Sequence, residues 1–116
     1  MTRKELIKLC LEYPNTYEDY PFDEIIDENA WTVMRHRGNK KSFAFIYESG
    51  GKLIINLKCN PEEADFFRSE YKSVTPAYHM NKTHCNSVET GGDVPEGLLL
   101  QMLKNSYDLT KPKNKI

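Results

Sequence analysis

Apolar residues recur at helical spacing near both ends of the chain. Near the N-terminus they lie between Leu6 and Tyr13, behind a Thr2/Glu5 pair with capping-box spacing, and this pattern predicts a helix over 3–13. Near the C-terminus a second apolar face begins at Leu98 and predicts a helix over 95–109. These two segments are the strongest helical signals in the sequence.

Two further helix starts follow from capping chemistry. The run Asn60-Pro61-Glu62-Glu63 offers a capping side chain, a proline suited to a first turn and acids favoured by the helix dipole, so we expect a middle helix over 61–71. Asp93 and Glu96 repeat the capping-box spacing ahead of the C-terminal helix. Both starts are expected to be capped by side chains.

Strand-like runs fill the middle of the chain. Three of them combine β-branched or aromatic residues with partial alternation, over 31–37, 42–48 and 53–58. The connections between them contain glycine and are of hairpin length, which predicts an antiparallel meander. A fourth strand is expected over 85–90, and the proline-containing segments 13–23 and 74–83 are expected to be loops.

The sequence therefore predicts a single α+β domain. We expect an antiparallel sheet, a meander of three strands plus one or more further strands, packed against N-terminal, middle and C-terminal helices. At 116 residues the chain is near the commonest domain size, so residues 1–109 are assigned to one domain and 110–116 to a flexible basic tail.

Composition indicates the cellular location and the redox state of the cysteines. No stretch approaches the roughly 18 apolar residues of a membrane span, and the amphipathic N-terminus does not resemble a signal peptide. The three cysteines are far apart and form no CxxC pair, a pattern typical of reduced thiols. We expect a soluble cytoplasmic protein with no membrane partner and no cofactor.

Charge is segregated along the chain although the net charge is only −1. Residues 11–30 contain seven acids and no Lys or Arg, whereas the basic turn over 35–41 contains four cations and no acid. The candidate phosphate-contacting residues are Arg35, Arg37, Lys40 and Lys41, with Lys52 in the next turn as an extension. The alternative is that these cations keep a hairpin tip soluble and protect edge strands from pairing.

The densest polar run covers residues 78–86. Its candidate site residues are Tyr78, His79, Asn81, Lys82, His84 and Asn86. These groups can tie an irregular loop to the sheet through hydrogen bonds. Metal binding by His79 and His84 would need a third converging ligand, and the spacing matches no standard metal motif. Catalysis by Cys85 would need His84 beside it, whereas neighbours in a strand point to opposite faces.

Three segments together resemble the MmcQ/YjbR family. They are residues 13–22 (YPNTYEDYPF), 57–62 (LKCNPE) and 76–82 (PAYHMNK), followed by His84 and Asn86, and the similarity spans about residues 1–109. The resemblance implies a frataxin-like or secretion-chaperone-like α+β fold and the label of DNA-binding protein, and it supplies no catalytic residue. One position departs from the family pattern, since Cys85 stands where the family usually has Trp.

Two function hypotheses carry forward. The first is weak, sequence-blind DNA binding through the basic turn, although the overall pI near 6.3 argues against strong non-specific binding. The second is a non-enzymatic protein-interaction or chaperone-like module that binds a partner on its sheet face. An enzymatic function has only the polar run 78–86 in its favour.

Overall fold

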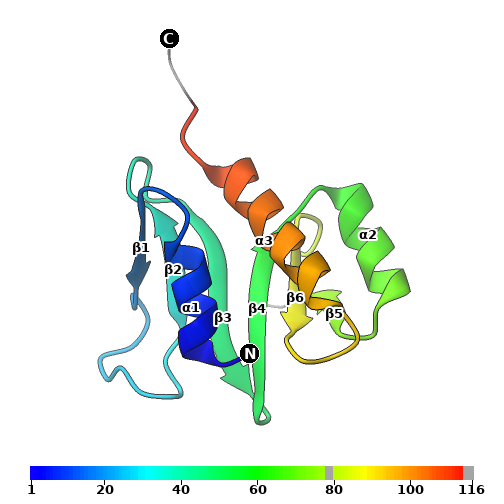
Figure 1. Cartoon of the computed structure of the whole chain (residues 1–116), viewed down its shortest axis with the longest axis horizontal. Coiled ribbons are helices and arrows are strands. Elements are labelled where there is room, and N and C mark those ends of the chain that lie inside the picture. The colour runs from blue at the N-terminus through cyan, green and yellow to red at the C-terminus, as the bar shows by residue number, and fades with distance from the viewer. Residues whose placement is uncertain (78–79, 114–116) are drawn as a thin grey trace.

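The computed structural model describes residues 1–77 and 80–113 and contains one antiparallel sheet with three helices (Figure 1). The six strands follow the spatial order β1-β2-β3-β4-β6-β5, and the predicted α+β class is confirmed. The strands are β1 (Thr16–Asp19), β2 (Thr32–His36), β3 (Ser42–Ser49), β4 (Lys52–Lys58), β5 (Val74–Pro76) and β6 (Cys85–Glu89). The helices are α1 (Arg3–Leu11), α2 (Pro61–Glu70) and α3 (Glu96–Thr110).

The helices cover one face of the sheet, and the hydrophobic core lies beneath them. Helices α1 and α3 lie across the central strands, with α2 beside β5 (Figure 1). Alternating positions of β3, β4 and β6 contribute core residues to this face: Ala44, Ile46, Ile55, Leu57 and Val88. We call this side the covered face and the opposite side the open face. None of the described helices is long and apolar enough to cross a membrane.

The prediction of side-chain capping is confirmed at α1 and wrong at α2 and α3. The Thr2 hydroxyl and the Glu5 carboxylate form a reciprocal capping box at α1. Helix α2 receives no side-chain cap from Asn60, and α3 begins after Pro95 without a side-chain cap. Asp93 instead accepts backbone N–H groups of residues 72 and 73 at 2.8 and 3.0 Å, because the fold brings the β5 turn within its reach.

Two short strands lie where loops were expected. Strand β1 pairs with β2, with Tyr17 opposite Arg35, and β5 pairs with β6, with Thr75 opposite Ser87. Both are edge strands, and the acids of β1 suit an edge because charge there discourages pairing with another chain. Strands of three or four residues have too little sequence pattern to be predicted alone and depend on their partner for hydrogen bonds.

The C-terminal helix extends to Thr110, one residue beyond the domain boundary predicted at residue 109, and packs against β2 there. A register shift between β2 and β3 places Phe43 against Tyr107 of α3, with ring centroids 5.4 Å apart. Thr110 is 4% exposed and lies 2.8 Å from Nε2 of His36, which is also buried. Helix α3 therefore runs through residue 110 and is tied to β2 at its end.

Candidate functional site

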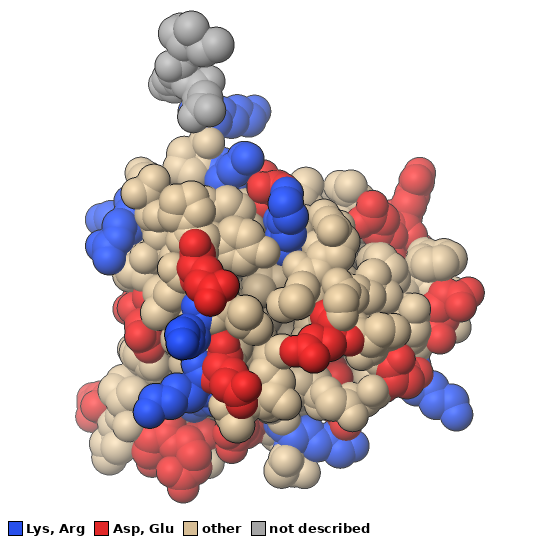
Figure 2. All heavy atoms as spheres, viewed as in Figure 1, with Lys and Arg blue, Asp and Glu red and all other residues tan. Residues whose placement is uncertain are grey.

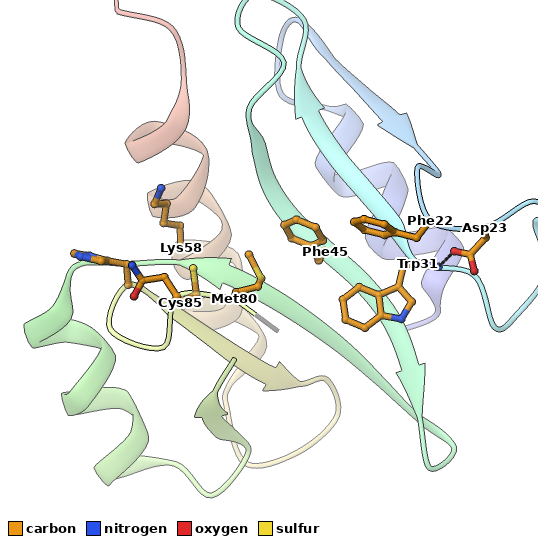
Figure 3. A pocket seen from close by; sticks show the side chains of 9 residues that line it. Phe22, Asp23, Trp31, Phe45, Lys58, Met80 and Cys85 are labelled. Carbon is orange, nitrogen blue, oxygen red and sulfur yellow. Dashed lines mark hydrogen bonds between the residues drawn. The ribbon is translucent and has the colours of Figure 1, made fainter. Parts of the chain in front are cut away.

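A pocket of about 790 Å³ lies on the open face between two walls (Figure 3). The aromatic wall consists of Phe22, Trp31 and Phe45. The opposite wall consists of Lys58, Met80, Asn81, His84 and Cys85. In Figure 3 the labelled residues of the two walls face one another across β3 and β4, while α1 and α3 lie behind the sheet. The pocket thus joins three separate parts of the chain on the side that the helices leave open.

The aromatic wall is an ordered set of rings. Trp31 stacks flat on Tyr47, with centroids 3.9 Å apart and planes 1° apart. Phe22 lies 6.5 Å from Phe45 in a nearly parallel orientation, and each of these two rings meets Trp31 edge-on at 6.4 Å. Phe22 is nevertheless 65% exposed, so this wall presents aromatic surface to solvent.

Hydrogen bonds from the Arg3 and Asp23 side chains to backbone groups hold the aromatic wall against the sheet. The guanidinium of Arg3 donates to the carbonyls of Asp27 (3.3 Å), Ala30 and Ile46 (3.0 Å), which ties the β1–β2 connection to β3. The carboxylate of Asp23 accepts the backbone N–H of Trp31 at 2.9 Å. The connection that carries Phe22 is therefore anchored at its base, although most of its side chains are exposed.

The opposite wall is held in a similar way by α2. Nε of Arg68 donates to Oδ1 of Asn86 at 2.6 Å, and its Nη2 donates to the carbonyls of Lys82 and Cys85, the latter at 3.2 Å. The amide of Asn86 donates in turn to the carbonyl of Ala64 at 3.3 Å. Arg68 thus fixes the turn that presents the opposite wall.

A buried polar network lies beneath the pocket. Oδ1 of Asn56, a residue 1% exposed, accepts the hydroxyls of Ser87 at 2.6 Å and Tyr47 at 3.3 Å. The Asn56 amide donates to Sδ of Met80 at 3.5 Å. Because these groups satisfy one another, the open face can hold polar side chains without solvent contact.

The structure separates the residues of the predicted polar run by role. Asn86 is buried and structural, whereas Asn81 and His84 are exposed and line the pocket. The Asn81 carboxamide oxygen accepts only the nearby Thr83 N–H, at 3.0 Å, among the described contacts. Lys82 contributes its carbonyl to Arg68. The two predicted site residues Tyr78 and His79 lie outside the described residues.

The expectation that His84 and Cys85 point to opposite faces is wrong. Strand β6 begins at Cys85, so His84 belongs to the preceding turn, where strand alternation does not apply, and both side chains line the pocket. Burial raises the pKa of Cys85, and it raises that of Cys59 to about 11. Both thiols are therefore poor nucleophiles at neutral pH. No cluster of three metal-ligating residues occurs within 1–77 and 80–113.

The arginines of the basic turn are only partly available. Nε of Arg35 pairs with Oδ2 of Asp19 at 2.8 Å, and its Nη1 donates to the carbonyl of Lys40 at 3.0 Å. Arg37 lies over the ring of Tyr17, with its guanidinium carbon 5.4 Å from the ring centroid. Arg35 is therefore engaged by an acid of the neighbouring edge strand, whereas Arg37 stays exposed.

The lysines of the predicted patch do not form one surface. Lys40 and Lys41 are exposed at the β2–β3 turn and pair with no described acid. Lys52 lies at the other end of β3, in the β3–β4 hairpin, where its ammonium is 3.5 Å from the Glu89 carboxylate. Figure 2 shows acids gathered at the lower left, where Figure 1 places the β1–β2 connection.

The pocket itself was not foreseen from the sequence. A signal for it exists in the half-buried aromatics Phe45 and Tyr47, which alternate with the buried Ile46 on β3. An amphipathic strand normally turns polar residues outward, so aromatic rings at both of these positions indicate that the open face is also in use.

These features describe a small α+β protein in which helices cover one face of the sheet and the other face carries a pocket. A sequence model described as YjbR matches residues 11–109, and the chain belongs to the YjbR family. It is 31% identical to the uncharacterized protein YyaQ of Bacillus subtilis, with 96% of this chain and 99% of YyaQ covered. It is 26% identical to the uncharacterized protein YjbR of Escherichia coli K12, covering 92% and 85% of the two chains.

Solved structures agree with the fold. A crystal structure of a Pseudomonas syringae protein matches with a TM-score of 0.81 at 28% identity, covering 95% of this chain and 99% of that one. A Deinococcus radiodurans protein with a DUF419 domain matches with a TM-score of 0.78 at 32% identity, covering 93% and 77%. The names of these relatives assign no activity, so a function for this chain has to be argued from its own site.

Proposed function

We propose that this protein is a non-enzymatic binding protein that holds a small organic molecule in the open-face pocket. The observation that carries the proposal is the pocket itself, whose volume of about 790 Å³ falls in the range of about 300–1,000 Å³ typical of ligand sites. Its apolar rings lie at the surface on anchored segments. A preformed site of this kind limits the conformational entropy that a ligand would have to offset on binding.

The chemistry of the lining supports binding over catalysis. The thiol of Cys85 is kept protonated by burial, as the raised pKa indicates. The Asp23 carboxylate accepts the backbone N–H of Trp31 and so holds the aromatic wall in place. The open-face partner expected from the sequence was another protein, but a concave site suits a small molecule better than a flat interface of about 800 Å² per partner.

A neutral aromatic probe and a pocket-filling substitution test this proposal. Isothermal titration calorimetry should show naphthalene-2-methanol binding to the parent protein. Cys85→Trp places a large ring in the pocket and should abolish binding. Thr75→Trp is the matched control, because Thr75 is exposed on β5 and does not line the pocket. Absence of binding to the parent, or equal binding by the folded Cys85→Trp variant, would contradict the proposal.

DNA binding through the basic turn is the second candidate function. It is supported by three exposed cations on one turn, Arg37, Lys40 and Lys41, none of which pairs with an acid among the described residues. With Arg35 engaged by Asp19, we expect three phosphate contacts. The slope of log K against log salt should then be about −2.7, at roughly −0.9 per phosphate.

A salt titration with double-stranded DNA tests this second function. Lys40→Glu with Lys41→Glu should weaken binding to every sequence alike, because phosphate contacts carry little base information. Lys52→Glu with Lys72→Glu makes the same charge reversal at the opposite end of the sheet, at the β3–β4 hairpin and just before β5, and serves as the control. No binding by the parent near 50 mM salt, or equal loss in both double variants, would remove this candidate.

A further inference from the structure

Resting on the proposed function, we propose that the ligand is a flat aromatic molecule that carries one carboxylate. The pocket is asymmetric in a way that matches such a molecule. One wall offers aromatic rings, and the opposite wall brings together Lys58, Asn81 and His84. An apolar body and an anionic group of one ligand would therefore lie at opposite ends of the same site.

Lys58 supplies the positive charge of the opposite wall. It is the last residue of β4, and its backbone N–H donates to Oγ of Ser106 at 2.9 Å, which fixes the strand end. Its side chain is exposed, and its ammonium pairs with no carboxylate among the described residues. A carboxylate in the pocket would thus meet a cation that has no competing acid beside it.

Two further hydrogen-bond donors lie at this end of the pocket. Asn81 uses its carboxamide oxygen to accept the Thr83 N–H, so that oxygen is already occupied and the NH₂ group is available to donate. The His84 ring is exposed beside it and can donate through one ring nitrogen in either protonation state. A carboxylate, which only accepts hydrogen bonds, fits this set better than a neutral or cationic group.

The aromatic wall suits a flat apolar body. Phe22 and Phe45 are nearly parallel, at 17°, and Trp31 meets both edge-on, so a further ring can add by stacking or by an edge contact. The sulfur atoms of Met80 and Cys85 lie on the facing wall, and sulfur makes favourable contacts with aromatic rings. Both sides of a flat molecule would therefore find favourable contacts.

Asp23, the acidic residue of the pocket lining, does not favour a cationic group at the end of the pocket that contains Lys58. Asp23 lies beyond Trp31, at the opposite side of the pocket from Lys58 (Figure 3). One of its carboxylate oxygens already accepts the backbone N–H of Trp31. An aromatic amine would have to place its charge near Lys58 or reverse its orientation, and we expect it to bind more weakly than the acid.

Three probes of one shape test the charge preference. 2-Naphthoate, naphthalene-2-methanol and naphthalene-2-methylamine differ only in the polar group, and calorimetry at pH 7 ranks their affinities. We expect the acid to bind about tenfold more tightly than the alcohol, the magnitude of one charge-assisted hydrogen bond. Equal affinities, or tighter binding of the amine, would overturn the inference while the proposed function stands. No binding of the alcohol or the other probes would remove both.

A matched pair of lysine variants tests whether Lys58 binds the carboxylate of the ligand. Lys58→Met should bring the acid down to the affinity of the alcohol and leave the alcohol unchanged. Lys52→Met makes the same change at the other end of the same strand and should leave all three affinities unchanged. The acid's advantage should also shrink between 50 and 500 mM salt, as screening requires. If Lys58→Met retains the full advantage, the ligand's anion is not held by Lys58 and the inference fails.

Discussion

The two faces of the central sheet use the same strands for different purposes. Ile46 and Phe45 are neighbours on β3, yet Ile46 is completely buried beneath the helices while Phe45 is only half-buried on the open face. Helices α1 and α3 lie over the covered face (Figure 1), and the open face carries the pocket between the aromatic wall and the opposite wall (Figure 3). Which face of the sheet a residue occupies therefore decides how deeply its side chain is buried.

The faces also differ in what holds them. The covered face is held by apolar contacts among core residues such as Leu6, Ile55 and Leu103. The loops of the open face are held by two arginines, Arg3 and Arg68, that donate to backbone carbonyls. Apolar contacts are non-directional, whereas hydrogen bonds to carbonyls fix the direction and distance at which a loop is held.

The largest expected effect is a difference in stability loss between substitutions on the two faces of the sheet. Ile46→Ala should lower the free energy of unfolding by about 2–5 kcal/mol, because it leaves a cavity in the covered core. Phe45→Ala should cost about 1 kcal/mol, since its ring is only half-buried, and should instead weaken probe binding. Urea denaturation measures both. Equal losses of stability would show that the open face is a second core and not a binding surface.

The next effect tests the anchor of the opposite wall. Arg68→Met keeps the aliphatic stem but removes every hydrogen bond to Asn86 and the turn carbonyls, and should cost about 1–3 kcal/mol of stability. It should also weaken binding of the naphthalene probes, because the turn that carries Asn81 and His84 loses its support. Arg68→Lys is the comparison, and it should restore the charge but not the paired hydrogen bonds. Unaltered probe binding by Arg68→Met would separate the anchor from the pocket.

The covered face also has a proton-linked contact. Burial lowers the pKa of His36 below 6.5 in the folded protein. The unfolded chain therefore binds more protons as pH falls, so this contribution to stability is complete above pH 6.5 and is lost as pH falls from 6.5 towards the folded pKa. The urea midpoint of the parent should fall between pH 7 and 5.5 by more than that of His36→Gln. Parallel pH profiles would mean that His36 stays accessible to protons.

The smallest effect concerns the rim of the sheet. Lys52 and Glu89 form an exposed ion pair at 3.5 Å, next to the β3–β4 hairpin. Lys52→Ala should change stability by less than about 1 kcal/mol, because exposed pairs contribute little in water. A larger loss in urea would assign the hairpin end of the open face a structural role that its exposure does not suggest.

Several elements were predictable from the sequence because their information is local. The α1 capping box at Thr2 lies within one helical turn of the residues it serves. The β2–β3–β4 meander follows from alternation and short glycine-containing turns, and the apolar face of α3 from its own periodicity. In each case the residues that determine the element are close together in the sequence, so spacing alone identifies it.

The remaining features depended on contacts between distant segments. Strands β1 and β5 exist because β2 and β6 supply their hydrogen bonds, and Asp93 caps no helix because the β5 turn reaches it first. The pocket needs Phe22, Phe45 and Met80 to meet across three connections, and no spacing rule links residues so far apart. The sequence by itself thus determined the class and most elements of this protein, through local propensity and periodicity. Only tertiary packing decided which aromatic side chains stayed exposed and which cations remained unpaired.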